Sequence, residues 1–198
     1  MSDLNNNKNQ SNIIIYFDMD GVLFEYDRSD YTGDKPRFIT PGSHCYRDKK
    51  PNKKAYEVCK KLIENNFDVR VLTAVSNMGH IFMEQTRDKV YALQKHYPFI
   101  DIDTKFIATT LKKDALIKSL CDYGSIYAHS NFGPNRILID DYNPNLKDWS
   151  FRGGTALKYC NGINDPSSFE GLVLTEEMSA DDIIELITTY LCYTSGQY

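Results

Sequence analysis

The sequence predicts an α/β protein built on a doubly wound parallel sheet, and three observations favour this fold class. Five short apolar segments rich in β-branched and aromatic residues occur along the chain, as expected of strands covered on both faces. Helical segments separate most of them, and strands that alternate with helices indicate a parallel sheet. Several strands end in carboxylate or hydroxyl residues, at the edge where such sheets bind ligands.

The first strand is expected at residues 13–17 (Ile-Ile-Ile-Tyr-Phe), an unbroken apolar run that ends in Asp-Met-Asp-Gly. Gly21 permits a sharp turn directly after it, because glycine adopts backbone conformations closed to other residues. The remaining strands are expected at residues 67–72 (ending at Thr73), 105–109, 136–140 and 155–159.

Helices are expected over residues 53–66, 80–96, 112–121 and 180–193. The first of them has apolar residues at helical spacing and a stop at Asn65-Asn66, since asparagine tolerates the left-handed conformation that ends helices. The last begins with Ser179 and has Asp182 three residues later, which is a capping-box pattern.

The chain is expected to form one domain over residues 13–198, preceded by a flexible tail at 1–12. Residues 24–52 are rich in glycine, proline and aromatic residues and fit neither helix nor strand. They predict a small irregular cap insert. Its aromatic residues either pack the insert against the core or stack on a nucleobase: Phe24, Tyr26, Tyr31, Phe38 and Tyr46.

Composition excludes several classes of protein. A net charge of −4 gives no general attraction to nucleic acid or to anionic membranes. No apolar run approaches the roughly 20 residues that cross a bilayer, and the polar start lacks a signal-peptide core. Five scattered cysteines fit a reducing cytoplasm better than a disulfide framework or a zinc cluster. The basic run at residues 49–54 is either a solvated loop or a region that attracts a phosphorylated substrate.

Acidic and hydroxyl side chains are expected to meet at the strand ends. Asp18 and Asp20 follow the first strand, Thr73 ends the second, and Asp140 and Asp141 end the fourth. Neighbouring carboxylates repel one another and are costly to bury unless a cation joins them. Oxygen ligands favour a hard divalent ion, so we expect Mg²⁺ and a small phosphorylated substrate.

This set of residues fits phosphoryl transfer. One carboxylate of the first pair can attack phosphorus and form an acyl-phosphate, while the other transfers protons. Thr73 can hold a phosphoryl oxygen. A lysine is needed to offset charge, and both Lys112 and Lys113 open the helix that follows the third strand.

The motifs that carry these residues resemble the haloacid-dehalogenase-like superfamily. IIIYFDMDGVLF (residues 13–24) resembles its motif I, and VRVLTAVSN resembles motif II. LKKDAL (111–116) is similar to the motif III lysine region, and RILIDDYNPNLKDW (136–149) to motif IV. The motifs occur in the expected order and cover most of residues 13–160, so the resemblance implies a Rossmann-like core with phosphatase chemistry.

The resemblance also implies a role for each catalytic residue. Asp18 is the nucleophile and Asp20 the general acid and base, and an aspartate in this second position favours phosphatases. Thr73 and the Ala74 N–H bind the phosphoryl group. Lys112 is our choice for the motif III lysine, with Lys113 as the alternative.

The implied magnesium ligands are the Asp18 carboxylate, the backbone carbonyl of Asp20 and Asp140. Asp141 supports the ion from further out, through water. Asn143 and Trp149 are expected in the loop that follows motif IV.

The branch that the chain resembles most is that of the 5′(3′)-deoxyribonucleotidases. DMDGVLF, the long motif IV and GGTALKYCNG at 153–162 carry this resemblance, which implies a 5′-nucleotidase for (deoxy)nucleoside monophosphates. Nucleotidases of that branch insert a helical-bundle cap, whereas residues 24–52 do not look like a bundle. A phosphatase for another small phosphate ester or for a nucleic-acid end is therefore an alternative, as is a non-catalytic phosphate-binding domain.

Overall fold

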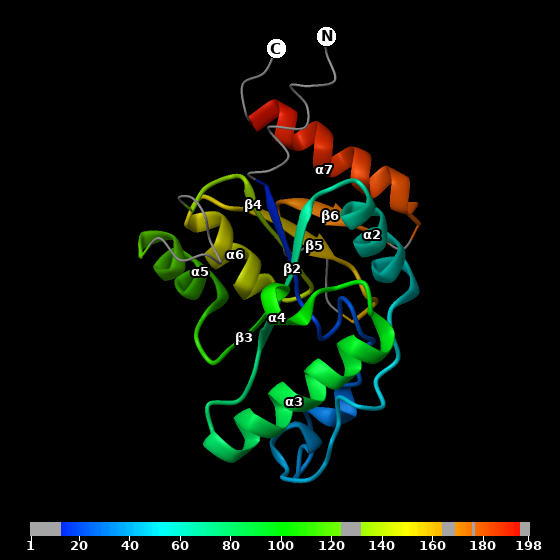
Figure 1. The fold of residues 1–198 in the computed structure, drawn as a ribbon, viewed down its shortest axis with the longest axis vertical. Coiled ribbons are helices and arrows are strands. Elements are labelled where there is room, and N and C mark those ends of the chain that lie inside the picture. Colours follow the sequence, from blue (N-terminus) through cyan, green and yellow to red (C-terminus); the bar gives the residue numbers. More distant parts are fainter. Residues whose placement is uncertain (1–12, 124–131, 164–168, 176, 195–198) are drawn as a thin grey trace.

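A computed structural model of the chain describes residues 13–123, 132–163, 169–175 and 177–194, so the predicted tail at 1–12 lies outside the described residues. A six-stranded sheet crosses the molecule (Figure 1) in the order β3-β2-β1-β4-β5-β6. All five strand pairings are parallel. The predicted α/β class with a doubly wound parallel sheet is confirmed. The strands are β1 (Ile14–Phe17), β2 (Asp68–Ala74), β3 (Phe106–Thr109), β4 (Arg136–Asp140), β5 (Thr155–Tyr159) and β6 (Leu172–Leu174).

Helices cover both faces of this sheet (Figure 1). Alternate residues of β1 explain how, since successive side chains of a strand point to opposite faces. Ile15 and Phe17 belong to the core cluster that also contains residues of α2, α3 and α7. Ile14 and Tyr16 pack with α5 and α6 on the other face. The helices are α2 (Lys53–Glu64), α3 (Gly79–His96), α4 (Ile102–Lys105), α5 (Lys113–Asp122), α6 (Asn143–Phe151) and α7 (Ala180–Thr194).

The strand order reverses between β1 and β4. From β1 the chain adds β2 and β3 on one side of the sheet, and then β4, β5 and β6 on the other. The loops that leave β1 and β4 therefore diverge, and their carboxyl ends border the crevice where ligands bind in open α/β sheets. The predicted carboxylates stand at this position.

Three elements differ from the prediction: helix α6, the short helix α4 and the short strand β6. Residues Asn143–Phe151, expected as a loop, form α6. Pro144 stands in the first turn of that helix, where proline is well tolerated because its missing N–H would have no helical partner. Trp149 is fully buried and donates to the Arg136 carbonyl. The short strand β6 was not predicted.

Residues 24–52 form the irregular insert that the sequence predicts. Their regular structure consists of two 3₁₀ turns, Arg28–Asp30 and Arg37–Ile39. An isolated bridge between Phe24 and Pro51 brings the two ends of the insert together. In Figure 1 the insert lies beside α3, at the end of the molecule opposite α7.

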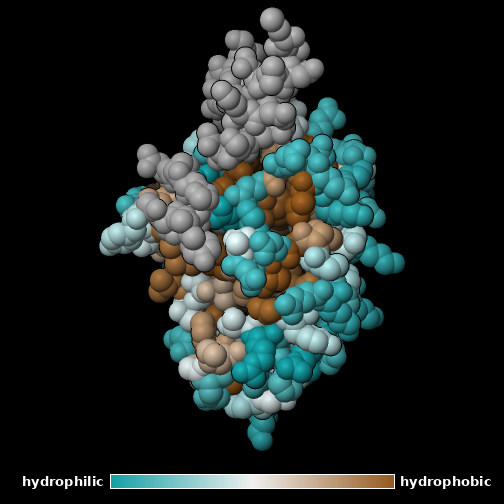
Figure 2. All heavy atoms as spheres, in the orientation of Figure 1, coloured by the Kyte–Doolittle hydropathy of each residue, from teal (hydrophilic) through white to brown (hydrophobic). Residues whose placement is uncertain are grey.

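The surface view agrees with this arrangement of layers. Figure 2 shows hydrophilic residues over the side of the molecule formed by α2 and α7, while hydrophobic residues are seen mainly in the middle, over the sheet. Among the helices of the described residues, none is long and apolar enough to cross a membrane.

Candidate active site

Three buried carboxylates meet where β1 and β4 end. Asp18 directly follows β1, and its N–H donates to the Ile139 carbonyl of β4 at 2.9 Å. Asp140 is the last residue of β4 and Asp141 follows it. Each of these three carboxylates offers an oxygen, and the three oxygens lie within 4.8 Å of one another. The topology has thus brought together acidic residues more than 120 positions apart in the chain.

Burial and mutual repulsion raise the pKa values of two carboxylates in this cluster. Burial raises the pKa of Asp18 to about 6, with Lys113 opposing the rise and Asp140 adding to it. Burial also raises the pKa of Asp141 to about 7, and the Asp18 and Asp140 carboxylates raise it further. A divalent cation bound to all three oxygens would remove this repulsion. The donor set, which consists of carboxylate oxygens, fits magnesium.

Lys113 is the lysine at this site. Its Nζ lies 2.8 Å from Asp18 Oδ1 and 2.7 Å from Asp140 Oδ2, and the side chain is almost wholly buried. Burial disfavours the charged form, but the two carboxylates outweigh it and raise the pKa of Lys113.

The expectation that Lys112 reaches the site is wrong. Lys112 is the residue before α5, and its side chain is 72% exposed and paired with Asp148. Lys113 is the first residue of the helix. Successive helical residues point about 100° apart, so a boundary shift of one residue decides which lysine faces the carboxylates.

Asp140 is held from several directions. Its Oδ1 accepts from the Tyr142 N–H at 2.8 Å, and its Oδ2 accepts from the Asn145 side chain at 2.9 Å in addition to Lys113. Asn145 was not singled out in the sequence. It lies in the first turn of α6, so the unpredicted helix is what brings it to Asp140.

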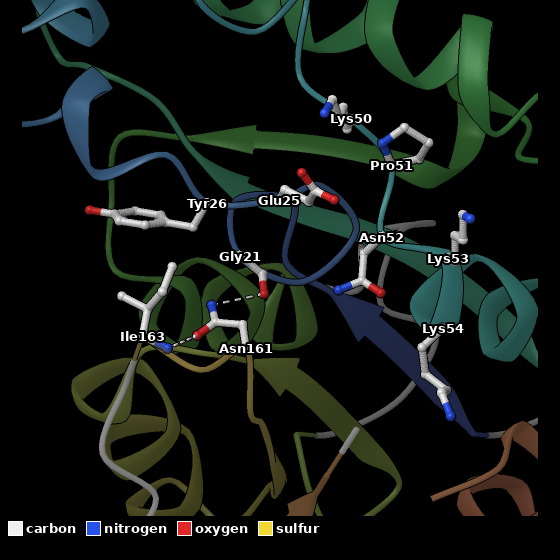
Figure 3. A pocket seen from close by; sticks show the side chains of 10 residues that line it. All are labelled: Gly21, Glu25, Tyr26, Lys50, Pro51, Asn52, Lys53, Lys54, Asn161 and Ile163. Carbon is white, nitrogen blue, oxygen red and sulfur yellow. Dashed lines mark hydrogen bonds between the residues drawn. The ribbon is translucent and has the colours of Figure 1, made fainter. Parts of the chain in front are cut away.

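Asn161 links the turn after β1 to the end of β4. Its side-chain amide donates to the Gly21 carbonyl at 3.1 Å and to Asp141 Oδ2 at 2.7 Å, and Figure 3 shows the bond to Gly21. Asp141 therefore stands within the carboxylate cluster with one oxygen already fixed by an amide.

Gly21 is required at this turn for two reasons. Its φ is +80°, a conformation that side chains with a Cβ rarely adopt. A Cβ added there would also lie 2.2 Å from Asp141 Oδ2.

The Asp20 carboxylate is not one of the three clustered carboxylates and instead binds Lys89 of α3. The Lys89 Nζ donates to Asp20 Oδ2 at 2.6 Å, to Thr73 Oγ1 at 2.6 Å and to the Ala74 carbonyl at 3.0 Å. These bonds use all three N–H groups of a fully buried ammonium. Because the Thr73 hydroxyl accepts from Lys89, its own hydrogen is available for another acceptor.

Lys89 is a site residue that was not predicted from the sequence, although the spacing of residues along α3 indicates that it faces the core. The buried positions of that helix are Ile81, Gln85, Asp88, Lys89, Ala92 and Leu93. They follow the spacing of a core-facing stripe, and three of them are polar. A lysine in such a stripe is rarely buried without a partner, so its position indicates a buried carboxylate opposite.

A second lysine approaches Asp20 from the insert. The Lys49 Nζ lies 3.6 Å from Asp20 Oδ1 and 3.4 Å from Asp30 Oδ2. Burial alone would raise the pKa of Asp20, but Lys89 and Lys49 outweigh it and the pKa is lowered. Asp20 is therefore held between the core and the insert.

Side chains of α3 bind the insert at several points. Glu84 accepts from the Gly42 N–H at 2.8 Å, and Asp88 accepts from Arg47 Nε at 2.6 Å. His44 Nδ1 lies 2.9 Å from the same Asp88 carboxylate. The Gln85 amide donates to the Phe38 carbonyl. The insert is thus attached to the helix that also carries Lys89.

A cavity of about 1020 Å³ opens over these residues. The carboxylates of Asp18, Asp20 and Asp141 border it, and Ala74 borders it from β2. The insert contributes an aromatic wall: Tyr26 and Tyr31 are stacked with centroids 4.8 Å apart, and Tyr31 packs on Phe38 at 5.2 Å. These three rings of the insert therefore pack on one another and also line the cavity.

Comparisons with known proteins identify the fold. A scan against protein-family models finds no match, and no curated protein is significantly similar in sequence. Similar solved structures include the D,D-heptose 1,7-bisphosphate phosphatase of Burkholderia thailandensis, with a TM-score of 0.58 and 10% identity over 89% of this chain and 99% of that one. The same enzyme from B. bronchiseptica, in complex with magnesium and phosphate, has a TM-score of 0.58 and 13% identity, covering 90% and 99%. A HAD hydrolase of family IA from Entamoeba histolytica has a TM-score of 0.56 and 14% identity, covering 89% and 99%. The chain has the fold of these hydrolases.

Proposed function

We propose that this protein is a magnesium-dependent phosphomonoester hydrolase that works through an aspartyl-phosphate. One observation carries the proposal: the buried Asp18, Asp140 and Asp141 carboxylates lie within 4.8 Å of one another, and Lys113 bridges two of them. Asp18 belongs to this cluster, whereas Asp20 is bound to Lys89. The two neighbouring carboxylates can therefore serve different purposes, Asp18 as the nucleophile and Asp20 as the proton-transfer group. The fold shared with phosphatases supports the same chemistry.

We assign the attack on phosphorus to one oxygen of Asp18, and the contacts of this side chain support the choice. The Met19 N–H donates to Oδ1 at 2.7 Å, and Lys113 pairs with the same oxygen. Among the described residues this leaves Oδ2 for bond formation with phosphorus. Attack breaks the ester P–O bond and gives an acyl-phosphate, and the leaving oxygen takes a proton from Asp20.

Water completes the reaction. It transfers a proton to Asp20 while its oxygen bonds to phosphorus and the bond from phosphorus to Asp18 breaks, which releases phosphate. The Thr73 hydroxyl donates to a phosphoryl oxygen, because its acceptor side is used by Lys89. The N–H of Ala74, at the edge of the cavity, is a second donor to that group.

Magnesium would be held by the carboxylates of Asp18, Asp140 and Asp141, together with the Asp20 carbonyl. When bound, it neutralises charge on the transferred phosphoryl group. Lys113 supplies the remaining positive charge from the protein itself.

Turnover of an aryl phosphate tests this function. Purified protein with Mg²⁺ is expected to hydrolyse 4-nitrophenyl phosphate, and Asp18→Asn is expected to abolish turnover while the protein remains folded. Lack of turnover by the wild type with Mg²⁺, Mn²⁺ and Co²⁺ would contradict the proposal and favour a non-catalytic phosphate-binding domain.

We further propose nucleoside monophosphates as the substrates. The aromatic wall of Tyr26, Tyr31 and Phe38 supports this choice, because aromatic rings stack on bases. A panel of nucleoside monophosphates, sugar phosphates and a DNA 3′-phosphate tests it by kcat/KM. The sugar-phosphate arm is included because similar folds act on heptose bisphosphates. A higher value for a sugar phosphate or a DNA end would refute the nucleotide proposal and leave phosphatase activity intact.

A further inference from the structure

Three buried polar atoms near Asp20 have no hydrogen-bond partner among the described residues. They are Asp20 Oδ1, Lys49 Nζ and the Tyr31 hydroxyl. Two come from the insert, and the third belongs to the carboxylate to which we assign proton transfer. Buried polar atoms are nearly always paired, so an unpaired group at one place requires an explanation.

The two oxygens of Asp20 have different surroundings. Oδ2 accepts a hydrogen bond of 2.6 Å from Lys89, which fixes it to the core. Among the described residues, the charged partner of Oδ1 is Lys49 at 3.6 Å, which is longer than a hydrogen bond. Since Lys89 occupies Oδ2, the oxygen available to exchange a proton with the substrate is Oδ1.

Aromatic faces and a second carboxylate keep Lys49 in place. Its Nζ lies 5.1 Å from the centre of the Tyr31 ring and 5.4 Å from that of Tyr46, distances at which a cation is attracted to a ring. Asp30, itself buried and paired with Arg37 at 3.0 Å, lies 3.4 Å from the same ammonium. The ammonium thus stays close to Asp20 without being hydrogen-bonded to it.

We propose that Lys49 and Tyr31 are positioning residues for proton transfer by Asp20. Lys49 attracts Oδ1 toward the insert, and Tyr31, a residue that lines the same cavity as Asp20, limits the orientations open to that carboxylate through its buried hydroxyl. The insert is then part of the catalytic apparatus and not only a wall of the substrate pocket. This inference rests on the proposed phosphatase function.

A pair of substrates of nearly equal size tests it. Phenyl phosphate has a basic leaving group that needs a proton, whereas 4-nitrophenyl phosphate has a leaving group that departs without one. Lys49→Met is expected to lower kcat/KM for phenyl phosphate by about 10- to 100-fold, a partial loss of the roughly 100- to 10,000-fold that general acid catalysis contributes. For 4-nitrophenyl phosphate the same variant is expected to lose less than about threefold.

Lys50→Met is the matched control. Lys50 is the next residue of the same segment and is exposed, so its removal is expected to leave the ratio of the two kcat/KM values unchanged. Lys49→Arg, which keeps the charge, is expected to recover part of the selective loss.

Tyr31→Phe keeps the ring that packs on Lys49 and removes only the hydroxyl. It is expected to show a smaller loss, selective in the same direction, and it carries the test if Lys49→Met does not fold. Equal losses on both substrates, or no loss, would overturn the inference while wild-type turnover still supported the proposed function. A wild type inactive on both substrates would overturn both proposals.

Discussion

Lys89 and Asp20 form an ion pair inside the protein, with Nζ 2.6 Å from Oδ2 and no exposed surface on the lysine side chain. The pair joins α3 to the turn after β1, and the same ammonium binds the end of β2 through Thr73. The buried ammonium of Lys89 therefore fixes the relative positions of Asp20, to which we assign proton transfer, and Thr73, to which we assign binding of the phosphoryl group.

Replacing Lys89 by methionine is expected to impair both activity and stability. Asp20 and Thr73 would lose their shared donor, and kcat for phenyl phosphate, whose leaving group needs a proton, is expected to fall by about 100-fold. Removing one partner of a buried ion pair is expected to lower the free energy of unfolding by about 3 kcal/mol. Steady-state kinetics and urea unfolding measure the two effects. Lys95→Met, an exposed change on the same helix, is the control, and equal behaviour of the two variants would contradict the assignment.

The two neighbouring lysines at the start of α5 are expected to behave differently. Lys113→Met removes the ammonium between Asp18 and Asp140, and kcat/KM is expected to fall by about 1000-fold because charge on the phosphoryl group is no longer offset. Lys112→Met only breaks an exposed pair with Asp148, so activity is expected to stay within about twofold of wild type. The reverse order of effects would show that the lysines are wrongly assigned.

Gly21→Ala is expected to abolish turnover and to lower the free energy of unfolding by more than about 2 kcal/mol. The added Cβ would meet Asp141 Oδ2 at 2.2 Å in a backbone with φ of +80°. Gly153→Ala separates the effect of the backbone conformation from that of the close contact, because Gly153 has φ of +93° but a Cβ there meets no atom of the described residues within 4 Å. We expect that control to cost only about 1 kcal/mol and to keep its activity. Activity measurements and urea unfolding of both variants make the comparison.

Asp68 is expected to make stability depend on pH at the acidic end. Burial would raise its pKa, but hydrogen bonds from Arg70 and Lys105 outweigh it and the pKa is lowered. A lowered pKa means that the unfolded chain takes up the proton first. The stabilisation is therefore complete above the ordinary pKa, near 3.8, and is lost as the pH falls toward the lower folded value.

Asp68→Asn tests this prediction. The variant is expected to be about 2 kcal/mol less stable than wild type at pH 7, and the gap is expected to shrink as the pH is lowered from 5 to about 3. Urea unfolding across that range measures it. A gap that does not change with pH would mean that the charge of Asp68 contributes nothing to stability.

The sequence was sufficient to predict the carboxylate cluster because local pattern and topology agree there. Asp18 and Asp140 follow unbroken apolar runs, and parallel strands place such ends at one edge of a sheet. The choice between Lys112 and Lys113 depended on where a helix begins to within one residue, which sequence patterns locate poorly. The helix after Asp141 was missed because Asn143-Pro144 was interpreted as a turn, although proline is also common in the first turn of a helix.

The contacts of Asp20 could not be predicted for a different reason. Lys49, Lys89 and Asp20 are brought together by tertiary packing alone, and no local pattern relates them. Lys49 stands in a basic run that looks solvent-exposed, yet its side chain is 5% exposed. Only the structure shows that this lysine turns inward while its neighbour Lys50 does not.

The bonds between the insert and α3 limit how the protein can be re-engineered. Glu84, Gln85 and Asp88 hold the insert, and Lys89 on the same helix holds Asp20. A chimera that transplants residues 24–52 onto another core of this fold would leave these anchors behind. The insert and the inner face of α3 form one exchangeable module, and we expect grafts to work only when both are moved together.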